Sequence, residues 1–370
     1  MAQQSCFLFK LCLNNFQNQP KRRNFVTFSL WIVRIMKKQV VILFLVGLAL
    51  AACAPEKRKA DTSDSNLEIK IGRFDQDFWA MKGQDLPAAL AHVDSLYPDF
   101  LPIYLERVVQ FGKKDDSLTV FTLQKFFADT AVVHLYGDAL RAYQHIEPIE
   151  ADLTQAFRRA NYFFPDKKTP HFYMHVSGLN QSVVVGEGFL SLSIDNYLGE
   201  SYPLYERVGI YNYLRQNMCP EKVVPDYVVA WLTSEFPFVP RTGELMEELL
   251  YRGKILYVAS VLLPDVDESV LMGYTPEQWK WCQKHESEMW LTMIEGKHLF
   301  SHDSMLRVKY LNDAPFTSLF SQESPGRAGA YIGWQIIENY MKANPDVSPL
   351  DLLYSVNASY ILQQSGYDPR

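Results

Sequence analysis

The sequence predicts an α+β protein that is mainly helical, with helices surrounding one small sheet in a single body over residues 67–370. Segments with apolar residues at three- and four-residue spacing fill both halves of this region, which is typical of amphipathic helices. Between them lie short runs that are β-branched or alternating and are bounded by Gly and Pro, which is typical of strands. No Gly/Ser-rich linker, charge block or internal repeat interrupts the region, so we expect one domain.

The expected elements follow in chain order. The segment 67–71, LEIKI, alternates apolar and polar residues as a half-buried strand does. Helices are then expected at 86–96, 102–111, 117–127, 132–144 and 150–164. Strands follow at 171–176, 182–186 and 188–194. Helices are expected again at 225–233, 243–263, 276–295 and 328–343, and Pro276 after Thr275 is typical of the first position of a helix.

Residues 36–53, MKKQVVILFLVGLALAAC, have the pattern of a bacterial lipoprotein export signal. Two lysines form a basic start, the apolar stretch 40–50 is too short to span a bilayer comfortably, and LAAC matches the lipobox that precedes a diacylated cysteine. We therefore expect a signal peptide at 36–52 and a lipidated mature N-terminus at Cys53. The alternative is an uncleaved anchor helix starting at Trp31, but three basic residues interrupt it.

The segments on either side of the signal carry further expectations. Residues 1–35 have no acidic residue and no domain-like pattern, which indicates a start codon placed too early. Residues 53–66, CAPEKRKADTSDSN, are polar and suit a flexible tether between lipid and body. Ala rather than Asp follows Cys53, which favours the outer membrane. The tether also lacks an early acidic run of the kind associated with surface display, so we expect the body to face the periplasm.

The charge balance argues against a nucleic-acid partner. The leader through Ala52 holds seven Lys or Arg and no Asp or Glu, which leaves 29 basic and 42 acidic residues in the remainder, a formal charge of −13. An acidic body has no electrostatic reason to lie on an anionic membrane, so membrane attachment should come from the lipid on Cys53. Cys219 and Cys282 are the other cysteines of the mature chain, and the sequence leaves open whether they form a disulfide or two separate thiols.

Four motifs together identify a family. They are LSIDNYLGESYPLY at 192–205, VPDY at 224–227, ELLYRGKILY at 248–257 and ESPGRAGAYIGWQI at 323–336. The chain resembles the gliding-motility lipoproteins called GldB through essentially its whole mature length. The resemblance implies an envelope lipoprotein of Bacteroidetes-type bacteria that works with other envelope proteins in gliding motility or the linked secretion machinery, with no established catalytic activity.

Proteins of the GldB type are in turn similar to predicted zinc metallopeptidases. In those proteins an HExxH helix and a later carboxylate hold Zn²⁺, and the Glu of the motif activates water. The similarity would place the motif on residues 230–235, AWLTSE, which contain no histidine, and the third ligand on Arg252. Because a cation in a ligand position repels Zn²⁺, the resemblance implies a zincin-like scaffold without the metal motif.

Other candidate catalytic residues are poorly supported by their spacing. His298 and His302 are four apart beside Asp303, but the surrounding Gly and Ser residues predict a loop. His171 and His175 are also four apart, but on a strand this spacing separates them by about 13 Å. No GxSxG elbow or dinucleotide-binding Gly pattern occurs, so we expect no catalytic residue, no metal and no cofactor. The alternative is a metal-dependent hydrolase that uses an unrecognised set of histidines and carboxylates.

A binding cleft is expected where the loop after the last strand meets the last long helix. Gly329 and Gly333, at four-residue spacing, permit close approach of another backbone. Arg327 is poorly placed for the helix dipole, which favours a specific carboxylate partner. We expect Glu323 and Arg327 to tie this helix to the loop. The residues expected to form the cleft or a partner-binding surface are Asp195, Tyr197, Tyr205, Glu206, Arg252, Glu323 and Arg327.

Tyrosines are concentrated in the stretch after the last strand. They stand at positions 197, 202, 205, 211 and 213, and tyrosine is favoured at protein interfaces. The stretch therefore predicts a partner-binding surface, although these side chains could instead line the core. A small glycan or peptide bound near Asp195 and Tyr205 is a further possibility.

Overall fold

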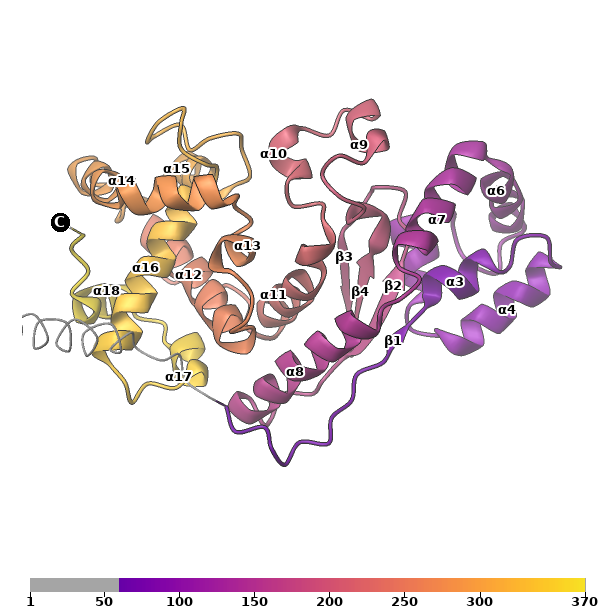
Figure 1. The fold of residues 1–370 in the computed structure, drawn as a ribbon, viewed down its shortest axis with the longest axis horizontal. Helices are drawn as coiled ribbons and strands as arrows, with labels where there is room; N and C mark the ends of the chain where they lie inside the picture. Colours follow the sequence, from indigo (N-terminus) through magenta and orange to yellow (C-terminus); the bar gives the residue numbers. More distant parts are fainter. Residues whose placement is uncertain (1–59, 370) are drawn as a thin grey trace, which may run out of the picture. The chain divides into compact units, whose positions relative to one another are not determined.

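The computed structural model describes residues 60–369. The chain divides into two units, Met1–Glu56 and Lys57–Arg370, and the described residues belong to the second. The expected extension at 1–35, the signal peptide at 36–52, Cys53 and the start of the tether lie outside the described residues. Figure 1 shows the helices and strands of the second unit, which are mainly helical with one small sheet, as the sequence predicts.

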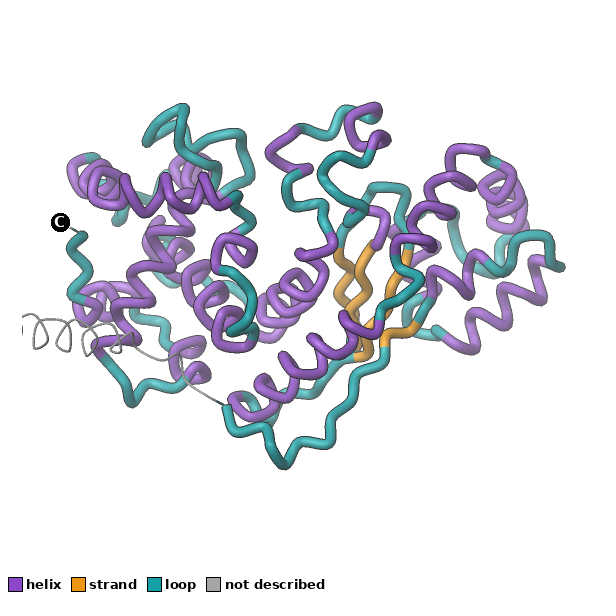
Figure 2. The backbone as a smooth tube through the Cα atoms, viewed as in Figure 1, coloured by secondary structure: helices purple, strands orange, loops and turns teal. Residues whose placement is uncertain are grey.

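Four strands form the sheet, in the order β1-β2-β4-β3. They are β1 (Ile71–Gly72), β2 (His171–His175), β3 (Val183–Gly186) and β4 (Phe189–Ser193). β1 and β4 pair parallel with β2, and β3 pairs antiparallel with β4 at the sheet edge. Figure 2 shows the strands enclosed by helical segments. The three strands predicted after residue 170 are confirmed.

The strand expected at 67–71 pairs only at its end. The N–H of Ile69 donates to Thr154 Oγ1 at 3.0 Å, and the N–H of Ile71 donates to Glu150 Oε1 at 2.9 Å. Both acceptors lie on α8 (Glu147–Phe163). Side chains of α8 therefore accept hydrogen bonds from backbone N–H groups that would otherwise need a neighbouring strand as acceptor.

The helices between β1 and β2 enclose an aromatic core. They are α3 (Phe74–Trp79), α4 (Leu86–Leu96), α5 (Leu101–Ile103), the π-helical η1 (Tyr104–Val108), α6 (Ser117–Ala128), α7 (Thr130–Ala142) and α8. The rings of Phe74, Phe78, Phe100 and Tyr104 pack with centroids 4.7–5.8 Å apart. The helix expected at 102–111 is present, but most of it is a π-helical turn that ends at Val108.

The helices after the sheet are long ones separated by short ones. They are η2 (Ile194–Asn196), α9 (Pro203–Arg207), α10 (Asn212–Arg215), η3 (Pro220–Lys222), α11 (Val223–Glu235), α12 (Leu245–Leu262), α13 (Glu268–Met272), α14 (Pro276–Glu295), α15 (Ser304–Leu311), α16 (Ala328–Ala343), α17 (Pro349–Tyr354) and α18 (Ala358–Ser365). Within the described residues, no helix combines the length and the apolar character needed to cross a membrane.

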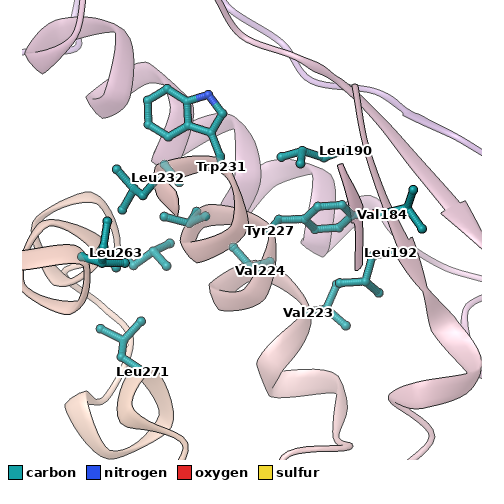
Figure 3. Close-up of a cluster of buried hydrophobic side chains, with 14 of the residues drawn as sticks. Val184, Leu190, Leu192, Val223, Val224, Tyr227, Trp231, Leu232, Leu263 and Leu271 are labelled. Atoms are coloured by element: carbon teal, nitrogen blue, oxygen red, sulfur yellow. The ribbon is translucent and has the colours of Figure 1, made fainter. Parts of the chain in front are cut away.

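Helix α11 joins the sheet to the C-terminal helices (Figure 1). Its Tyr227 is fully buried, and Figure 3 shows this ring among Val184, Leu190 and Leu192 of the sheet. The Tyr227 hydroxyl donates to Tyr173 O at 2.6 Å, which fixes the helix against β2. Because α11 also packs on α12, the residues of these two helices meet on one side of the sheet.

Helices α12 and α16 approach closely through glycine. A Cβ atom on Gly253 would lie 2.8 Å from the backbone nitrogen of Trp334 and closer still to Gly333 O. A Cβ on Gly333 would likewise meet the backbone of Leu249, and a Cβ on Gly329 would lie 2.8 Å from Tyr310 Cβ. The close approach predicted for the Gly329/Gly333 pair is confirmed.

Candidate functional site

Asp195 holds the loop after β2 to the end of β4. Its carboxylate accepts from the N–H of Ser177 at 3.1 Å, from the N–H of Leu179 at 2.7 Å and from the hydroxyl of Ser193. Burial raises the pKa of Asp195, and these hydrogen bonds oppose the rise only in part. Because the carboxylate is fully buried, it shapes the loop and does not face solvent.

Two of the predicted surface tyrosines are buried beside Asp195. The Tyr205 hydroxyl donates to Asp195 O at 2.7 Å, and the Tyr197 hydroxyl donates to Asp226 Oδ2 at 2.8 Å. Burial raises the pKa of both phenols. The prediction of a tyrosine surface is wrong for this pair, because their hydroxyls satisfy polar groups inside the fold; Tyr211, by contrast, is 67% exposed.

A polar pocket of about 410 Å³, here called the loop pocket, lies beside these tyrosines. The loops after β2 and β4, α10, the start of α11 and the segment before α16 line it. Its charged residues form two ion pairs, Lys222 with Asp226 at 2.9 Å and Arg327 with Asp313 at 3.0 Å. The lining residues are Leu179, Asn180, Ser182, Asn196, Tyr197, Ile210, Leu214, Asn217, Met218, Lys222, Asp226, Asp313 and Arg327.

Arg327 stands at the N-cap of α16 in a left-handed conformation, with φ of 58°. Its guanidinium pairs with Asp313 and donates from Nη2 to Met272 O at 2.7 Å. A Cβ on Gly273 would lie 2.6 Å from Arg327 Nη2, so only glycine leaves room for this contact. The expected carboxylate partner of Arg327 is therefore Asp313, and the expected tie to Asp195 and Glu206 is replaced by contacts to α13 and to the loop after α15.

A second pocket, of about 320 Å³ and here called the arginine pocket, also includes Arg327. It lies between α11, α12 and α16. Arg252 of α12 donates from Nη1 to Leu311 O at 2.9 Å and from Nη2 to Glu248 Oε1 at 2.9 Å. The lining residues are mostly apolar: Val229, Thr233, Phe238, Glu248, Tyr251, Arg252, Ile255, Leu256, Met272, Arg327 and Ala330.

The other predicted site residues lie outside both pockets. Glu206 is on the surface of α9, with a carboxylate oxygen 3.7 Å from Arg215 Nη1. Glu323 lies in the exposed part of the loop before α16, where its N–H donates to Ser321 Oγ at 3.1 Å. The structure thus brings together Tyr197 and Arg327 in the loop pocket, and Arg252 and Arg327 in the arginine pocket.

The sequence missed three charged residues of the loop pocket, Lys222, Asp226 and Asp313. Lys222 and Asp226 are four residues apart at the start of α11 and form an ion pair, so helical spacing and the VPDY motif were the available signals. Asp313 comes from the loop after α15, and only the fold brings it to the pocket.

The histidines stand in separate environments. Burial lowers the pKa of His175 to about 3, and its Nδ1 lies 2.7 Å from Ser191 Oγ inside the sheet. His298 and His302 lie in the loop between α14 and α15, as predicted, and His298 Nδ1 is 2.7 Å from Tyr310 Oη. Within residues 60–369, no group of three His, Cys, Asp or Glu side chains could hold a metal ion.

The two cysteines of the described body are separate thiols. Cys219 is half-buried and Cys282 is buried. Burial raises the pKa of Cys219 to about 11 and also raises the pKa of Cys282. Of the two alternatives that the sequence leaves open, the structure contains free thiols, and both are held in the unreactive protonated form.

The described residues form a mainly helical α+β domain, and the candidate site consists of the loop pocket and the arginine pocket. Residues 55–369 match the family model described as gliding motility protein GldB, so the chain belongs to this family. No curated protein and no solved structure matches the chain.

Proposed function

We propose that this protein is a lipid-anchored envelope protein that serves gliding motility or the linked secretion machinery by binding other envelope proteins, without catalysis. Family membership supports the role in motility. The lipobox ending at Cys53 supports a lipid anchor, and Ala54 after the cysteine supports sorting to the outer membrane. The tether without an early acidic run supports a body that faces the periplasm. Because the chain after the leader carries a formal charge of −13, the lipid is the proposed means of attachment to an anionic membrane.

One observation supports the absence of catalysis. Thr233 lies on the segment where a metallopeptidase would carry its zinc motif, and Arg252 stands where the third zinc ligand would be. Both residues line the arginine pocket. A guanidinium held there by Glu248 and Leu311 O would repel Zn²⁺. This arrangement is consistent with a zincin-like scaffold that has lost its metal and kept a pocket.

Metal content tests the non-catalytic role directly. Full-length protein is purified in detergent without chelator and without a histidine tag, and its metal content is measured by mass spectrometry. We expect far less than one zinc per chain. One zinc per chain would overturn the proposal and favour the metal-dependent hydrolase, and replacement of His171, His298 and His302 in turn would then find the ligands.

Lipid attachment has its own test. We expect Cys53→Ser to abolish incorporation of labelled palmitate and to release the protein from the membrane fraction. Cys219→Ser is the matched control, because this thiol lies within the folded body and should leave labelling unchanged. Labelling that persists in the Cys53 variant would refute the assigned lipid site.

A further inference from the structure

We propose that the arginine pocket binds the C-terminal carboxylate of a polypeptide whose last residue is apolar. This inference rests on the proposed protein-binding role and specifies the part of the partner that the pocket recognises. It is carried by the two guanidinium groups of the pocket, its apolar walls and its size.

The guanidinium donors of the pocket favour an anion as the ligand. Arg252 and Arg327 line it from two different helices or their ends, and Glu248 is the one acidic residue among the lining side chains. Each guanidinium is already oriented by one backbone carbonyl and one carboxylate. Since a guanidinium carries five N–H donors in a fixed plane, both retain donors for a carboxylate.

The remaining walls favour an apolar group beside that carboxylate. Side chains of α11, α12, α13 and α16 supply them, namely Val229, Ile255, Leu256, Met272 and Ala330. A volume of about 320 Å³ lies at the lower end of small-molecule pockets, which run from roughly 300 to 1,000 Å³. The space suits one terminal residue and its neighbour better than a long acyl chain.

Further features indicate a site that is formed before a ligand arrives. Glycine contacts fix α12 against α16, and Gly273 leaves room for the Arg327 guanidinium. The buried hydroxyl of Tyr251 has no hydrogen-bond partner of normal geometry within the described part of the chain, which leaves a polar atom at the wall of the pocket. A rigid pocket loses little conformational entropy on binding, so a short peptide should suffice as a probe.

The experiment uses the full-length protein in detergent and isothermal titration calorimetry. The probe is the pentapeptide Gly-Gly-Ser-Ala-Leu with a free carboxylate, and it is compared with its C-terminal amide and with octanoate. We expect the free acid to bind and the amide to bind at least about tenfold more weakly, because charge-assisted hydrogen bonds are lost. Equal binding of the amide would overturn the proposal, and so would no binding of the free acid at low millimolar concentration. Octanoate binding as tightly as the peptide would assign the pocket to a fatty acid instead.

Three variants locate the binding site. Arg252→Gln should lower the affinity for the free-acid peptide at least about tenfold. Ala330→Leu, which fills the apolar part without removing charge, should do the same. Arg107→Gln is the matched control, since Arg107 is exposed on η1, and it should leave affinity within about twofold. Unchanged affinity in either pocket variant overturns the proposal, and if one variant fails to fold by circular dichroism, the other decides.

Failure of this inference can be told apart from failure of the proposed function. If the protein contains no zinc and does not bind the peptide, the proposed carboxylate pocket is refuted, but the proposed role in partner binding is not. A protein with one zinc per chain refutes the non-catalytic role whatever the peptide does.

Discussion

Gly333→Ala should destabilise the body by opening the contact between α12 and α16. The added Cβ would lie 2.9 Å from the carbonyl carbon of Leu249, 3.0 Å from its Cδ2 and closer still to its oxygen. Two of these three atoms belong to the backbone of another helix, so no side-chain rotation can relieve the clash. The helices must separate, and the buried face of α16 around Trp334 and Ile337 must move with them.

The expected loss follows from two opposing effects. Overpacking a well-packed core costs about 1–3 kcal/mol, and a clash with backbone belongs at the upper end. Replacing a helical glycine by alanine returns about 0.5–1 kcal/mol, because the unfolded chain loses conformational freedom. We therefore expect a net loss of about 2 kcal/mol, which lowers the melting temperature by roughly 3 °C in a folded body of this size.

Urea unfolding followed by circular dichroism measures this loss. Gly137→Ala is the matched control, because Gly137 is also helical and its Cβ would find Arg141 Nη1 as its nearest neighbour at 3.7 Å. The control should gain about 0.5–1 kcal/mol. The reasoning is refuted if the two variants shift stability in the same direction.

Three further predictions concern buried polar groups and a cap. Tyr197→Phe removes the hydrogen bond to Asp226 and should cost about 1–2 kcal/mol in urea unfolding, whereas Tyr211→Phe, at an exposed ring, should cost nothing measurable. Burial lowers the pKa of Lys254 from 10.5 to about 8. Between about pH 8 and pH 10.5 the unfolded chain therefore binds one more proton at this lysine than the folded chain does. The stability of the wild type relative to Lys254→Met should therefore rise with pH from about 8 to 10.5, by up to about 3 kcal/mol, and a flat or falling difference would contradict this. Thr275→Ala removes the side-chain half of the capping box of α14 and should cost about 1 kcal/mol; an unchanged urea midpoint would show that the cap is dispensable.

The long helices were predictable because their signals are local. The helix predicted at 276–295 has the observed bounds, and Pro276 begins it as its place after Thr275 predicts. The structure adds a capping box between Thr275 and Gln278 at this end. The helix predicted at 328–343 is also observed with the same bounds. In these segments the apolar spacing and the signals at the helix ends agree, so tertiary contacts change the helix bounds little.

The short elements were less predictable, because contacts distant in sequence decide them. Of the predicted strand at 67–71, only Ile71 pairs with β2, and side chains of α8 accept from the N–H groups of Ile69 and Ile71. The five-residue α13 was not predicted, although Asp267 caps its start and Gly273 ends it in a left-handed conformation. A helix of one turn is too short to show apolar periodicity.

The candidate site was predicted in part, residue by residue but not as a set. Arg252 was chosen for its place in a lost zinc motif and Arg327 for its poor fit to a helix dipole. No property of the sequence says that both line one pocket, because this depends on how α12 packs against the start of α16. Asp195 was expected in a cleft, but its hydrogen bonds to loop backbone draw it into the interior.

The glycine contact and the arginine pocket depend on the same pair of helices. Gly333 packs on Leu249, which lies between Glu248 and Arg252 in sequence, and Ala330 of the same helix lines the pocket. Forcing α16 away from α12 must therefore change the distance between the two guanidinium groups, and a carboxylate that needs both will bind more weakly. We expect Gly333→Ala to reduce affinity for the free-acid pentapeptide at temperatures where the variant is still folded, while Gly137→Ala leaves it unchanged. Undiminished affinity in a folded but destabilised Gly333 variant would show that the pocket does not depend on this packing.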